Sequence, residues 1–427
     1  MVSDTPHGWL ERFAVSTPGE PALYSDAGVV SYGRLQELVF SRAKALRRIV
    51  VEGAIEPVAV RPDVVSIVEL LAIMRAGAVP LPYSDTSPTP PGHRLDEVAI
   101  CVSTSGSTRA PRLVPLSYRN ISAAVAASRE RLGTGPSDRW LATLPLDHVG
   151  GLSILWRSLE AGGSAVVAPF GRSVVGVIER SRPTIASLVP TMVHRLLDWS
   201  PDVLVSVGPV LVGGAGTSGV LATRARDLGV TLVPTYGMTE ASSQVATAIV
   251  GSNPASSLLI GPPLSGFKVT VIGESGEAPA GQPGAIEIDG PAVFSGYVGR
   301  PPRDGAFKTS DIGFLTPGGE LGIVGRADDV VLVGGLNVSL RAIRETTVSA
   351  SGVLDVAVVG IPDPEWGAIP CVMVEMETTR TLQDIQEEVL DNLPRGHAPH
   401  RWLLAPIPLL PNGKHNLSAV RARFVEG

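Results

Sequence analysis

Residues 231–240 read TLVPTYGMTE, and they carry more structural information than any other stretch of the chain. Residues 231–233 predict a short apolar strand, which an aromatic residue, a glycine, a hydroxyl and a carboxylate follow. Ligands of parallel sheets bind beyond the carboxyl ends of the strands. Thr239 could therefore hydrogen-bond a phosphate, and Glu240 could hold Mg²⁺ against it. The alternative is that Glu240 has only a structural role, as a carboxylate at the start of a helix.

Strands and helices alternate in the chain leading to this segment, from Ile100 to about Tyr236. Apolar runs of strand length lie at 140–144, 164–168, 185–189 and 210–212, and amphipathic helices are expected at 151–161, 190–199 and 220–228. This alternation predicts mostly parallel sheets covered by helices. Pro190 suits the first position of its helix, where a proline costs no intrahelical hydrogen bond.

The pattern changes after Gly261. Residues 267–272 and 285–289 alternate with period two between glycines and prolines, which predicts a β-rich subdomain at about 261–325. A third unit follows, with strands at 330–333, 355–359 and 371–376 and helices at 340–350 and 382–393. About 100 residues suffice for an α+β domain. The fold class is therefore α/β, with a large N-terminal domain at 1–325 and a small α+β C-terminal domain at 326–427.

Composition excludes several classes of protein. Hydrophobic residues make up 44% and charged residues 18%, as in ordinary globular proteins. The net charge is −6 without a basic run, which argues against nucleic-acid and membrane-surface binding. Cys101 and Cys371 are too far apart in sequence for a disulfide framework or a metal motif. The acidic N-terminus does not resemble a signal peptide, so the expected compartment is the cytoplasm. Residues 64–83 predict a buried helix and strand rather than a membrane span.

A small hydroxyl-rich loop follows the apolar segment 98–102. Such a loop can present hydroxyls and backbone N–H groups to phosphate oxygens, although a polar surface loop is the alternative. Its candidate phosphate ligands are Thr104, Ser105, Gly106, Ser107, Thr108 and Arg112. The P-loop and nucleophile-elbow patterns are absent from the sequence.

Three short segments complete the pattern: 309–311, 325–328 and 411–414. Each alone would be an ordinary turn. In this order and at these separations, together with the hydroxyl-rich loop and 236–240, they resemble the adenylate-forming superfamily. This superfamily contains acyl-CoA synthetases, aryl acid ligases, luciferases and peptide-synthetase adenylation domains. The resemblance covers the chain from about Ala22 to Lys414.

The resemblance implies a role for each matched residue. Lys414, Thr239 and Glu240 would be catalytic, with Glu240 as the Mg²⁺ ligand. Asp311 would hold both ribose hydroxyls with Arg326 nearby, and Asp328 would be the pivot about which the C-terminal domain rotates. The remaining ATP-binding residues would be Gly213, Gly214 and Ala215, beside the adenine, together with Tyr236, Gly237 and Met238. The implied cofactors are ATP, Mg²⁺ and coenzyme A.

Residues 145–158, 242–245 and 333–338 resemble one subfamily, the o-succinylbenzoyl-CoA synthetases of menaquinone biosynthesis. The resemblance implies an ATP-dependent acid:CoA ligase whose acyl pocket contains His148, Gly151, Arg157, Ser242 and Ser243. We hypothesise that Arg157 pairs with a second carboxylate of the acid, because a guanidinium binds a carboxylate in a bidentate manner. The alternative is an amphipathic helix from which Arg157 reaches solvent. For His148, lining the pocket is favoured over acting as a general base.

The chain also departs from the superfamily pattern. Arg109, Arg112 and Leu113 stand where the phosphate loop usually has glycine, lysine and glycine, and residues 341–344 are basic where the family has Glu-Ile-Glu. Three alternatives therefore stay open. The enzyme could use another aryl or alkyl carboxylic acid, it could be a degenerate homologue that binds acyl-adenylate or acyl-CoA without adenylating, or it could load a carrier protein. A homodimer also stays open.

Overall fold

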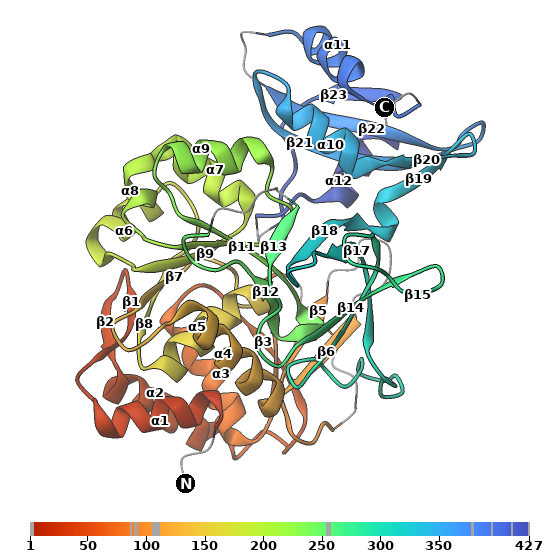
Figure 1. Ribbon diagram of the computed structural model, residues 1–427. Coiled ribbons are helices and arrows are strands. Elements are labelled where there is room, and N and C mark those ends of the chain that lie inside the picture. Colours follow the sequence, from red (N-terminus) through yellow and green to blue (C-terminus); the bar gives the residue numbers. More distant parts are fainter. Residues whose placement is uncertain are drawn as a thin grey trace.

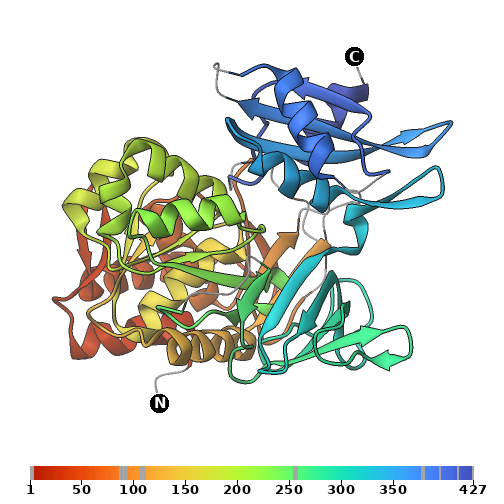
Figure 2. The ribbon, with the colours of Figure 1, turned by 45° about the horizontal axis from the view of Figure 1, so that its top comes forward.

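The computed structural model describes residues 4–85, 88, 92, 94–104, 112–252, 258–376, 380–393, 396–410 and 413–425, apart from the side chains of Asp328 and Asn337. These residues form a large N-terminal body and a smaller C-terminal body (Figure 1). In Figure 2 the chain leaves the β-rich part of the N-terminal body and passes through a short helical turn, residues 327–329, into the C-terminal body.

An eight-stranded sheet forms the centre of the N-terminal body, in the order β12-β11-β10-β9-β7-β8-β1-β2. The six inner strands run parallel, and β2 and β12 are antiparallel edges. The strands are β1 (Pro21–Ser25), β2 (Gly28–Ser31), β7 (Arg139–Ala142), β8 (Ser164–Val167), β9 (Ile185–Leu188), β10 (Val210–Val212), β11 (Leu232–Met238) and β12 (Ser243–Thr247). The predicted parallel sheet is confirmed.

Helices cover both faces of this sheet (Figure 1). Side chains alternate between two hydrophobic clusters: Trp140 and Ala142 face one, and Leu141 faces the other. One layer holds α1 (Pro6–Ser16), α2 (Tyr32–Leu46), α3 (Val64–Ala76), α4 (Tyr118–Leu132) and α5 (Val149–Ala161). The other holds α6 (Val174–Ser181), α7 (Pro190–Trp199), α8 (Pro201–Val205) and α9 (Gly219–Asp227). Strands buried on both faces read as continuous apolar runs, which explains the sequence pattern.

The segment 64–83 forms α3 and then β4 (Val79–Tyr83), as expected. Asp63 caps the start of α3 by accepting a hydrogen bond from the backbone N of Ser66 at 2.8 Å, and Gly77 ends the helix with φ of 92°. β4 pairs in parallel with β3 (Ile55–Ala59). Within the part of the chain that the structure describes, every helix is too short or too polar to cross a bilayer.

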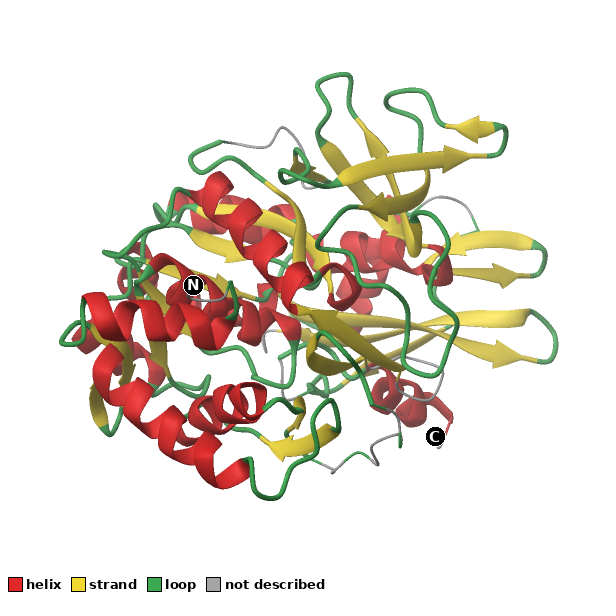
Figure 3. Cartoon of the chain, turned by 90° about the horizontal axis from the view of Figure 1, so that it is seen from below, coloured by secondary structure: helices red, strands yellow, loops and turns green. Residues whose placement is uncertain are grey.

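A six-stranded antiparallel sheet occupies the predicted β-rich segment, in the order β13-β18-β17-β16-β14-β15. Its strands are β13 (Leu259–Gly261), β14 (Lys268–Gly273), β15 (Gly276–Glu277), β16 (Gly284–Asp289), β17 (Phe307–Leu315) and β18 (Leu321–Arg326). Figure 3 separates this strand-rich part from the helix-rich remainder of the N-terminal body. A separate hairpin of β5 (Val98–Thr104) and β6 (Arg112–Ser117) encloses the hydroxyl-rich loop.

The C-terminal body is a five-stranded sheet with three helices. Its strands are β19 (Val330–Val333), β20 (Leu336–Ser339), β21 (Val353–Asp363), β22 (Gly367–Met376) and β23 (Arg401–Leu404), and its helices are α10 (Leu340–Ser349), α11 (Leu382–Asn392) and α12 (Leu417–Val425). The hairpin of β21 and β22 is longer than predicted, because its end at 360–363 and 367–370 contains glycines and prolines, which in a sequence usually mark turns.

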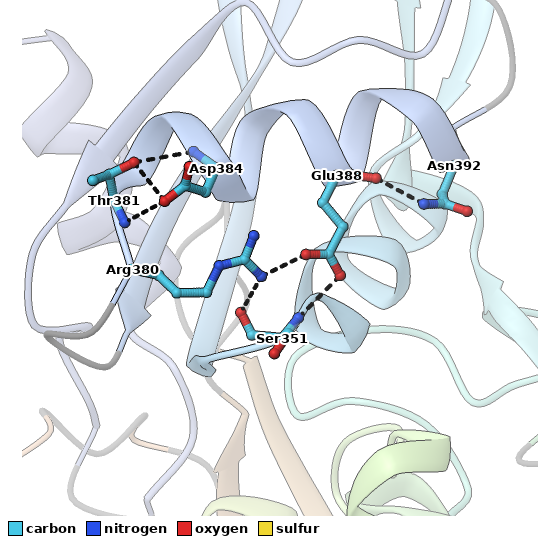
Figure 4. A network of polar contacts seen from close by, with 6 residues as sticks. All are labelled: Ser351, Arg380, Thr381, Asp384, Glu388 and Asn392. Carbon is cyan, nitrogen blue, oxygen red and sulfur yellow. Dashed lines mark hydrogen bonds and ion pairs between the residues drawn. The ribbon is translucent and has the colours of Figure 1, made fainter.

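A polar network fixes α11 to the turn that follows α10 (Figure 4). Arg380 pairs with Glu388 at 2.5 Å and donates to the Ser351 carbonyl at 2.8 Å. Thr381 and Asp384 form a capping box at the start of α11. Hydrogen bonds from Arg380 and from the backbone N of Ser351 lower the pKa of Glu388. These contacts stabilise the C-terminal body internally and lie outside the candidate site.

Candidate active site

The strands β9, β10 and β11 end where Lys414 of the C-terminal body approaches Gly214, and we call this region of the boundary between the bodies the cleft. The segments directly after these strands contain Val189, Gly213 and Gly214, and β11 itself ends in Met238. Gly213 and Gly214 are required here for close approaches. An added Cβ at Gly213 would lie 2.7 Å from Thr235 Cγ2, and Gly214 has φ of 77°. Gly214 and Ala215 are exposed, so this strand end is open to a ligand.

Asp311 forms a polar cluster with Tyr236 and Arg326. Tyr236 Oη donates to Asp311 Oδ2 at 2.6 Å, and Arg326 Nη1 lies 3.5 Å from Asp311 Oδ1. The pairing of β17 with β18 sets Asp311 directly opposite Arg326. Burial, and then the negative charge of Asp311, raise the pKa of Tyr236, so its hydroxyl remains a donor. A carboxylate fixed in this way can accept hydrogen bonds from a pair of vicinal hydroxyls.

A second cluster connects Glu240 to the end of the hydroxyl-rich loop. Glu240 follows β11 in the short helix η1 (Thr239–Ala241) and is only 9% exposed. Tyr297 Oη donates to Glu240 Oε1 at 2.7 Å, and the guanidinium of Arg112 lies 4.2 Å from the centroid of the Tyr297 ring. The sequence did not indicate Tyr297. Glu240 and Arg112 thus both contact Tyr297, Glu240 at its hydroxyl and Arg112 at the face of its ring.

The hydroxyl-rich loop is located by its ends. Thr104 pairs with Arg112 in the β5–β6 ladder, and Thr104 Oγ1 donates to the Arg112 carbonyl at 3.2 Å. Ser105, Gly106, Ser107 and Thr108 lie outside the described residues, as does Arg109. Arg112 stacks on Tyr297, whose hydroxyl contacts Glu240, so the residue at the end of the loop lies near the Glu240 carboxylate.

Lys414 reaches this cleft from the C-terminal body. A Cβ built on Gly214 would lie 2.9 Å from Lys414 Cε and 3.2 Å from Nζ. Burial, and then the positive charge of Arg326, lower the pKa of Lys414. The residue nevertheless keeps solvent access. A crowded but accessible ammonium is typical of a residue that projects into a cleft.

His148 is the residue before α5 and lies near enough to Lys414 to feel its charge. Its Nε2 is 3.9 Å from Asp147 Oδ1, while Asp147 Oδ2 accepts a hydrogen bond from Ser84 at 2.6 Å. Burial and the charge of Lys414 lower the pKa of His148, against an opposing effect of Asp147. At neutral pH the imidazole is therefore neutral, which suits a wall of the cleft.

Arg157 projects from α5 into the interior. It is 5% exposed, its Nη2 donates to Ser243 Oγ at 3.2 Å, and its guanidinium lies 5.4 Å from the centroid of the Trp140 ring. Burial lowers the pKa of Arg157 to about 9, which still leaves it charged at neutral pH. No carboxylate of the described residues pairs with this charge. The alternative in which Arg157 reaches solvent is wrong.

The other predicted acyl-pocket residues divide into two groups. Ser243 Oγ donates to Ser153 Oγ at 3.2 Å, next to Arg157, whereas the buried Ser242 hydroxyl donates to the Ala292 carbonyl at 2.9 Å. Both serines have positive φ, 56° at Ser242 and 118° at Ser243. Non-glycine residues in such conformations are strained and are frequent at functional sites.

Two glycines of the site are explained by packing. A Cβ at Gly237 would lie 1.9 Å from the Ser243 carbonyl oxygen, so only glycine allows the turn beside the serines. A Cβ at Gly151 would lie 2.2 Å from the Pro145 carbonyl oxygen. Only glycine at this position therefore allows the start of α5 to pack against that carbonyl. A direct contact of Gly151 with substrate stays a prediction. Asp328 lies in η2 (Ala327–Asp329), between β18 and β19, where a pivot is expected.

The basic segment 341–344 packs against the N-terminal body. Arg341 pairs with Glu345 at 2.7 Å and donates to the Ile323 carbonyl at 3.0 Å. Arg344 Nη2 lies 3.3 Å from the position of a Cβ on Gly216. Burial lowers the pKa of Arg344. In this arrangement Arg341 and Arg344 make contacts within the chain, and a docking face for an acidic carrier protein stays an open alternative.

The described residues contain no group of three or more His, Cys, Asp or Glu side chains that could hold a metal ion. A single buried carboxylate, Glu240, lies beside the loop predicted to bind phosphates. Mg²⁺ in nucleotide sites is commonly held by one or two carboxylates together with substrate phosphates. The residues therefore fit a nucleotide-bound Mg²⁺ and do not fit a metal cage made of protein alone.

A two-domain nucleotide-binding enzyme is indicated by three features together. They are the helix-covered parallel sheet, the Asp311 cluster and the lysine that projects from the second body. A family model described as AMP-binding enzyme matches residues 84–298, and one described as AMP-binding enzyme C-terminal domain matches residues 344–414. The chain belongs to the AMP-binding enzyme family.

Curated relatives and a solved structure agree with this assignment. A 2-succinylbenzoate–CoA ligase of Enterococcus faecalis is 32% identical, over 75% of this chain and 68% of the relative. A sulfoacetate–CoA ligase of Cupriavidus necator is 32% identical, over 79% of this chain and 69% of the relative. The fold matches o-succinylbenzoate CoA synthetase from Bacillus subtilis in complex with the acyl-adenylate OSB-AMP, with a TM-score of 0.85, 22% identity and coverage of 97% of both chains.

Proposed function

We propose that this protein is an ATP-dependent acid:CoA ligase. It joins a carboxylic acid to AMP with release of pyrophosphate and then transfers the acyl group to coenzyme A, with 2-succinylbenzoate as the acid. The carrying observation is the convergence of Lys414 with Asp311 and Arg326 in one cleft, since these residues come from both bodies. The proposed compartment is the cytoplasm, where ATP and coenzyme A are both supplied.

Acid activation requires positioning and charge stabilisation rather than a protein nucleophile. A carboxylate oxygen attacks the α-phosphate of ATP in line, and negative charge builds on the phosphate oxygens. Asp311, whose carboxylate is fixed by a hydrogen bond from Tyr236, accepts hydrogen bonds from the ribose hydroxyls and so fixes the nucleotide. Lys414 places a compact positive charge between the carboxylate and the α-phosphate. Arg112 supplies positive charge at the end of the phosphate loop. Glu240 would hold Mg²⁺, which would supply further positive charge against the phosphates.

Thioester formation needs a different arrangement of the two bodies. The thiol of coenzyme A attacks the acyl carbon of the adenylate, and AMP leaves. The ammonium of Lys414 has no task in this step, and its loop occupies the cleft. We infer that the C-terminal body rotates about Asp328 to admit the thiol. A few residues at the end of an element commonly absorb such a rotation.

The choice of acid follows from the buried charge of Arg157. 2-Succinylbenzoate carries two carboxylates, so one can react at the α-phosphate while the other pairs with Arg157. Ser243 adds a hydroxyl, and His148 lines the space between the two ends. Sulfoacetate also carries a second anionic group and is therefore the second candidate. A monocarboxylic acid would leave the Arg157 charge buried without a partner, which is costly.

The test is pyrophosphate exchange with 2-succinylbenzoate, sulfoacetate, benzoate and 3-benzoylpropionate. The proposal expects exchange with 2-succinylbenzoate to be well above that with benzoate or 3-benzoylpropionate. Each of these two monocarboxylates retains only one of the two carboxyl groups of 2-succinylbenzoate. Exchange with none of the acids, together with ATP-independent binding of acyl-CoA, would instead identify a non-adenylating binding protein. Supplying coenzyme A or a carrier protein as the acceptor then identifies the thiol from the product.

The activation step should show an alkaline limb set by Lys414. The ammonium is the active form and is lost as the pH rises through its pKa. Because that pKa is lowered from 10.5, activation should decline at a lower pH than an ordinary lysine would cause. Thioester formation from supplied acyl-adenylate should lack this limb. The two pH profiles, measured separately, check the assignment, and a shared limb would contradict it.

Tyr297→Phe should weaken the response to Mg²⁺. The variant removes the hydroxyl that fixes Glu240 but keeps the ring beneath Arg112. Residues that orient a metal ligand typically change metal affinity by about 10-fold or more. We expect about 10-fold more Mg²⁺ for half-maximal pyrophosphate exchange, with an unchanged KM for the acid. Phe170→Leu changes a ring that stacks on Trp199 rather than beneath Arg112 and serves as the control, and an unaltered Mg²⁺ titration in Tyr297→Phe would refute the role.

A further inference from the structure

The loop that carries Lys414 sits on the N-terminal end of α7. Thr191 Oγ1 donates a hydrogen bond of 2.6 Å to the Gly413 carbonyl, across 222 residues of sequence. A Cβ built on Gly413 would lie 3.2 Å from Met192 Cε and 3.4 Å from Val189 Cγ2. We name Val189, Thr191 and Met192 the α7 seat. It receives the residue that directly precedes Lys414.

The same seat borders the other side of the lysine. Val189 Cγ1 lies 3.5 Å from the position of a Cβ on Gly214, the glycine over which Lys414 extends. One valine therefore contacts the strand end through one methyl group and the lysine loop through the other. Gly413 has φ of 77°, a conformation that suits glycine. The loop can approach α7 so closely because residue 413 has no side chain.

The loop is also braced within the C-terminal body. The backbone N of Leu410 donates to the Lys414 carbonyl at 2.8 Å, and the backbone N of Gly413 donates to the Leu410 carbonyl at 2.9 Å. His415 Nε2 lies 2.9 Å from Asp355 Oδ2 on β21. Leu410, Gly413 and Lys414 are thus held together by backbone hydrogen bonds, and the next residue, His415, is fixed to β21. A hydrogen bond at Gly413 therefore constrains the position of Lys414.

We propose that Thr191 is a positioning residue that holds Lys414 in the cleft during acid activation and releases it for thioester formation. Thr191 acts through the Gly413 carbonyl. If the C-terminal body rotates between the two steps, this bond exists in only one of them. The inference rests on the proposed ligase function and adds to it a contact that favours one arrangement of the bodies.

The first test compares Thr191→Val with Thr191→Ser. Valine keeps the shape of threonine but loses the donor, whereas serine keeps the hydroxyl. We expect kcat for pyrophosphate release to fall about 3- to 10-fold in Thr191→Val, the effect of one hydrogen bond, with an unchanged KM for ATP. Thioester formation from supplied acyl-adenylate should keep its wild-type rate, and Thr191→Ser should restore activation. Equal losses in both steps, no loss in either, or a serine variant that behaves like the valine variant would overturn the proposal.

The second test needs no catalytic activity. The chain has four lysines, Lys44, Lys268, Lys308 and Lys414, so a lysine-specific protease has few sites. Cleavage after Lys414 requires the loop to leave the α7 seat, whereas Lys308, with 83% of its side chain exposed, reports cleavage independent of the seat. Proteolysis of a transiently opened segment follows the population of the open form.

We expect the ratio of cleavage after Lys414 to cleavage after Lys308 to rise about 3- to 10-fold in Thr191→Val and to stay at the wild-type value in Thr191→Ser. An unchanged ratio in Thr191→Val would overturn the proposal even in an active enzyme. Conversely, a wild-type protein without pyrophosphate release would refute the ligase function, while the cleavage ratio would still decide whether Thr191 holds the loop.

Discussion

Lys414→Ala is expected to lower the rate of acyl-adenylate formation by about 10²–10³-fold, the usual cost of removing one preorganised group that stabilises developing charge. Its ammonium lies over Gly214 and close to Arg326, at the strand end where the nucleotide is proposed to bind. A short side chain at residue 414 cannot reach this position. Thioester formation from supplied acyl-adenylate should be preserved, since the lysine is used in the first step alone.

Rapid-quench measurement of each half-reaction tests this expectation. Lys44→Ala is the matched control, because it removes an exposed lysine of the N-terminal body and should alter neither rate. A Lys414→Ala protein that loses both half-reactions to the same degree would point to a general defect in folding or binding. Full retention of pyrophosphate exchange would remove Lys414 from the mechanism.

Arg157→Leu is expected to lower activity with 2-succinylbenzoate while it raises the stability of the free enzyme. With 2-succinylbenzoate, kcat/KM should fall by about 10²–10³-fold, the scale on which a buried charge pair loses one partner. The KM for ATP should change little, since Arg157 lies on α5, away from the Asp311 cluster. The free enzyme should become more stable by about 1–3 kcal/mol, because a buried guanidinium without a carboxylate is replaced by an apolar side chain. Steady-state kinetics and denaturant unfolding check the two effects.

Arg131 offers a control in which the expected change in stability has the opposite sign. Its guanidinium donates to the carbonyls of Thr247, Pro262 and Pro263, so its contacts are structural. Arg131→Met should destabilise the protein, since three carbonyl oxygens lose their donor, and should not alter the preference among acids. A destabilised Arg157→Leu protein with an unchanged choice of acid would mean that Arg157 is a structural residue like Arg131.

Much of the fold could be predicted from local patterns. Fully apolar runs at 164–168 and 185–189 indicated strands buried on both faces, and β8 and β9 are buried at every residue. The period-two segments became the antiparallel sheet of 259–326. The end of the β21–β22 hairpin was missed because glycines and prolines interrupt its sequence, although Ile361 and Ile369 there are buried.

The contacts within the site were harder to predict. Tyr297 meets Glu240 across 57 residues and Thr191 meets Gly413 across 222, and no periodic pattern links such positions. Ser242 and Ser243 are neighbours in sequence, yet the positive φ at both turns only Ser243 towards Arg157. Motifs could identify which residue types gather at the cleft. The backbone conformation determines which of them point into it.

The α7 seat has a consequence for how the two bodies associate. Among the described residues, no hydrophobic cluster includes side chains from both bodies, and a groove between α7, α9 and Ser349 separates them over part of their boundary. The contact behaves as a weak complex whose partners are kept at high effective concentration by a tether of a few residues. Such a complex forms readily and dissociates readily. The turnover of this protein can therefore include one association and one dissociation per cycle without an external energy source beyond ATP.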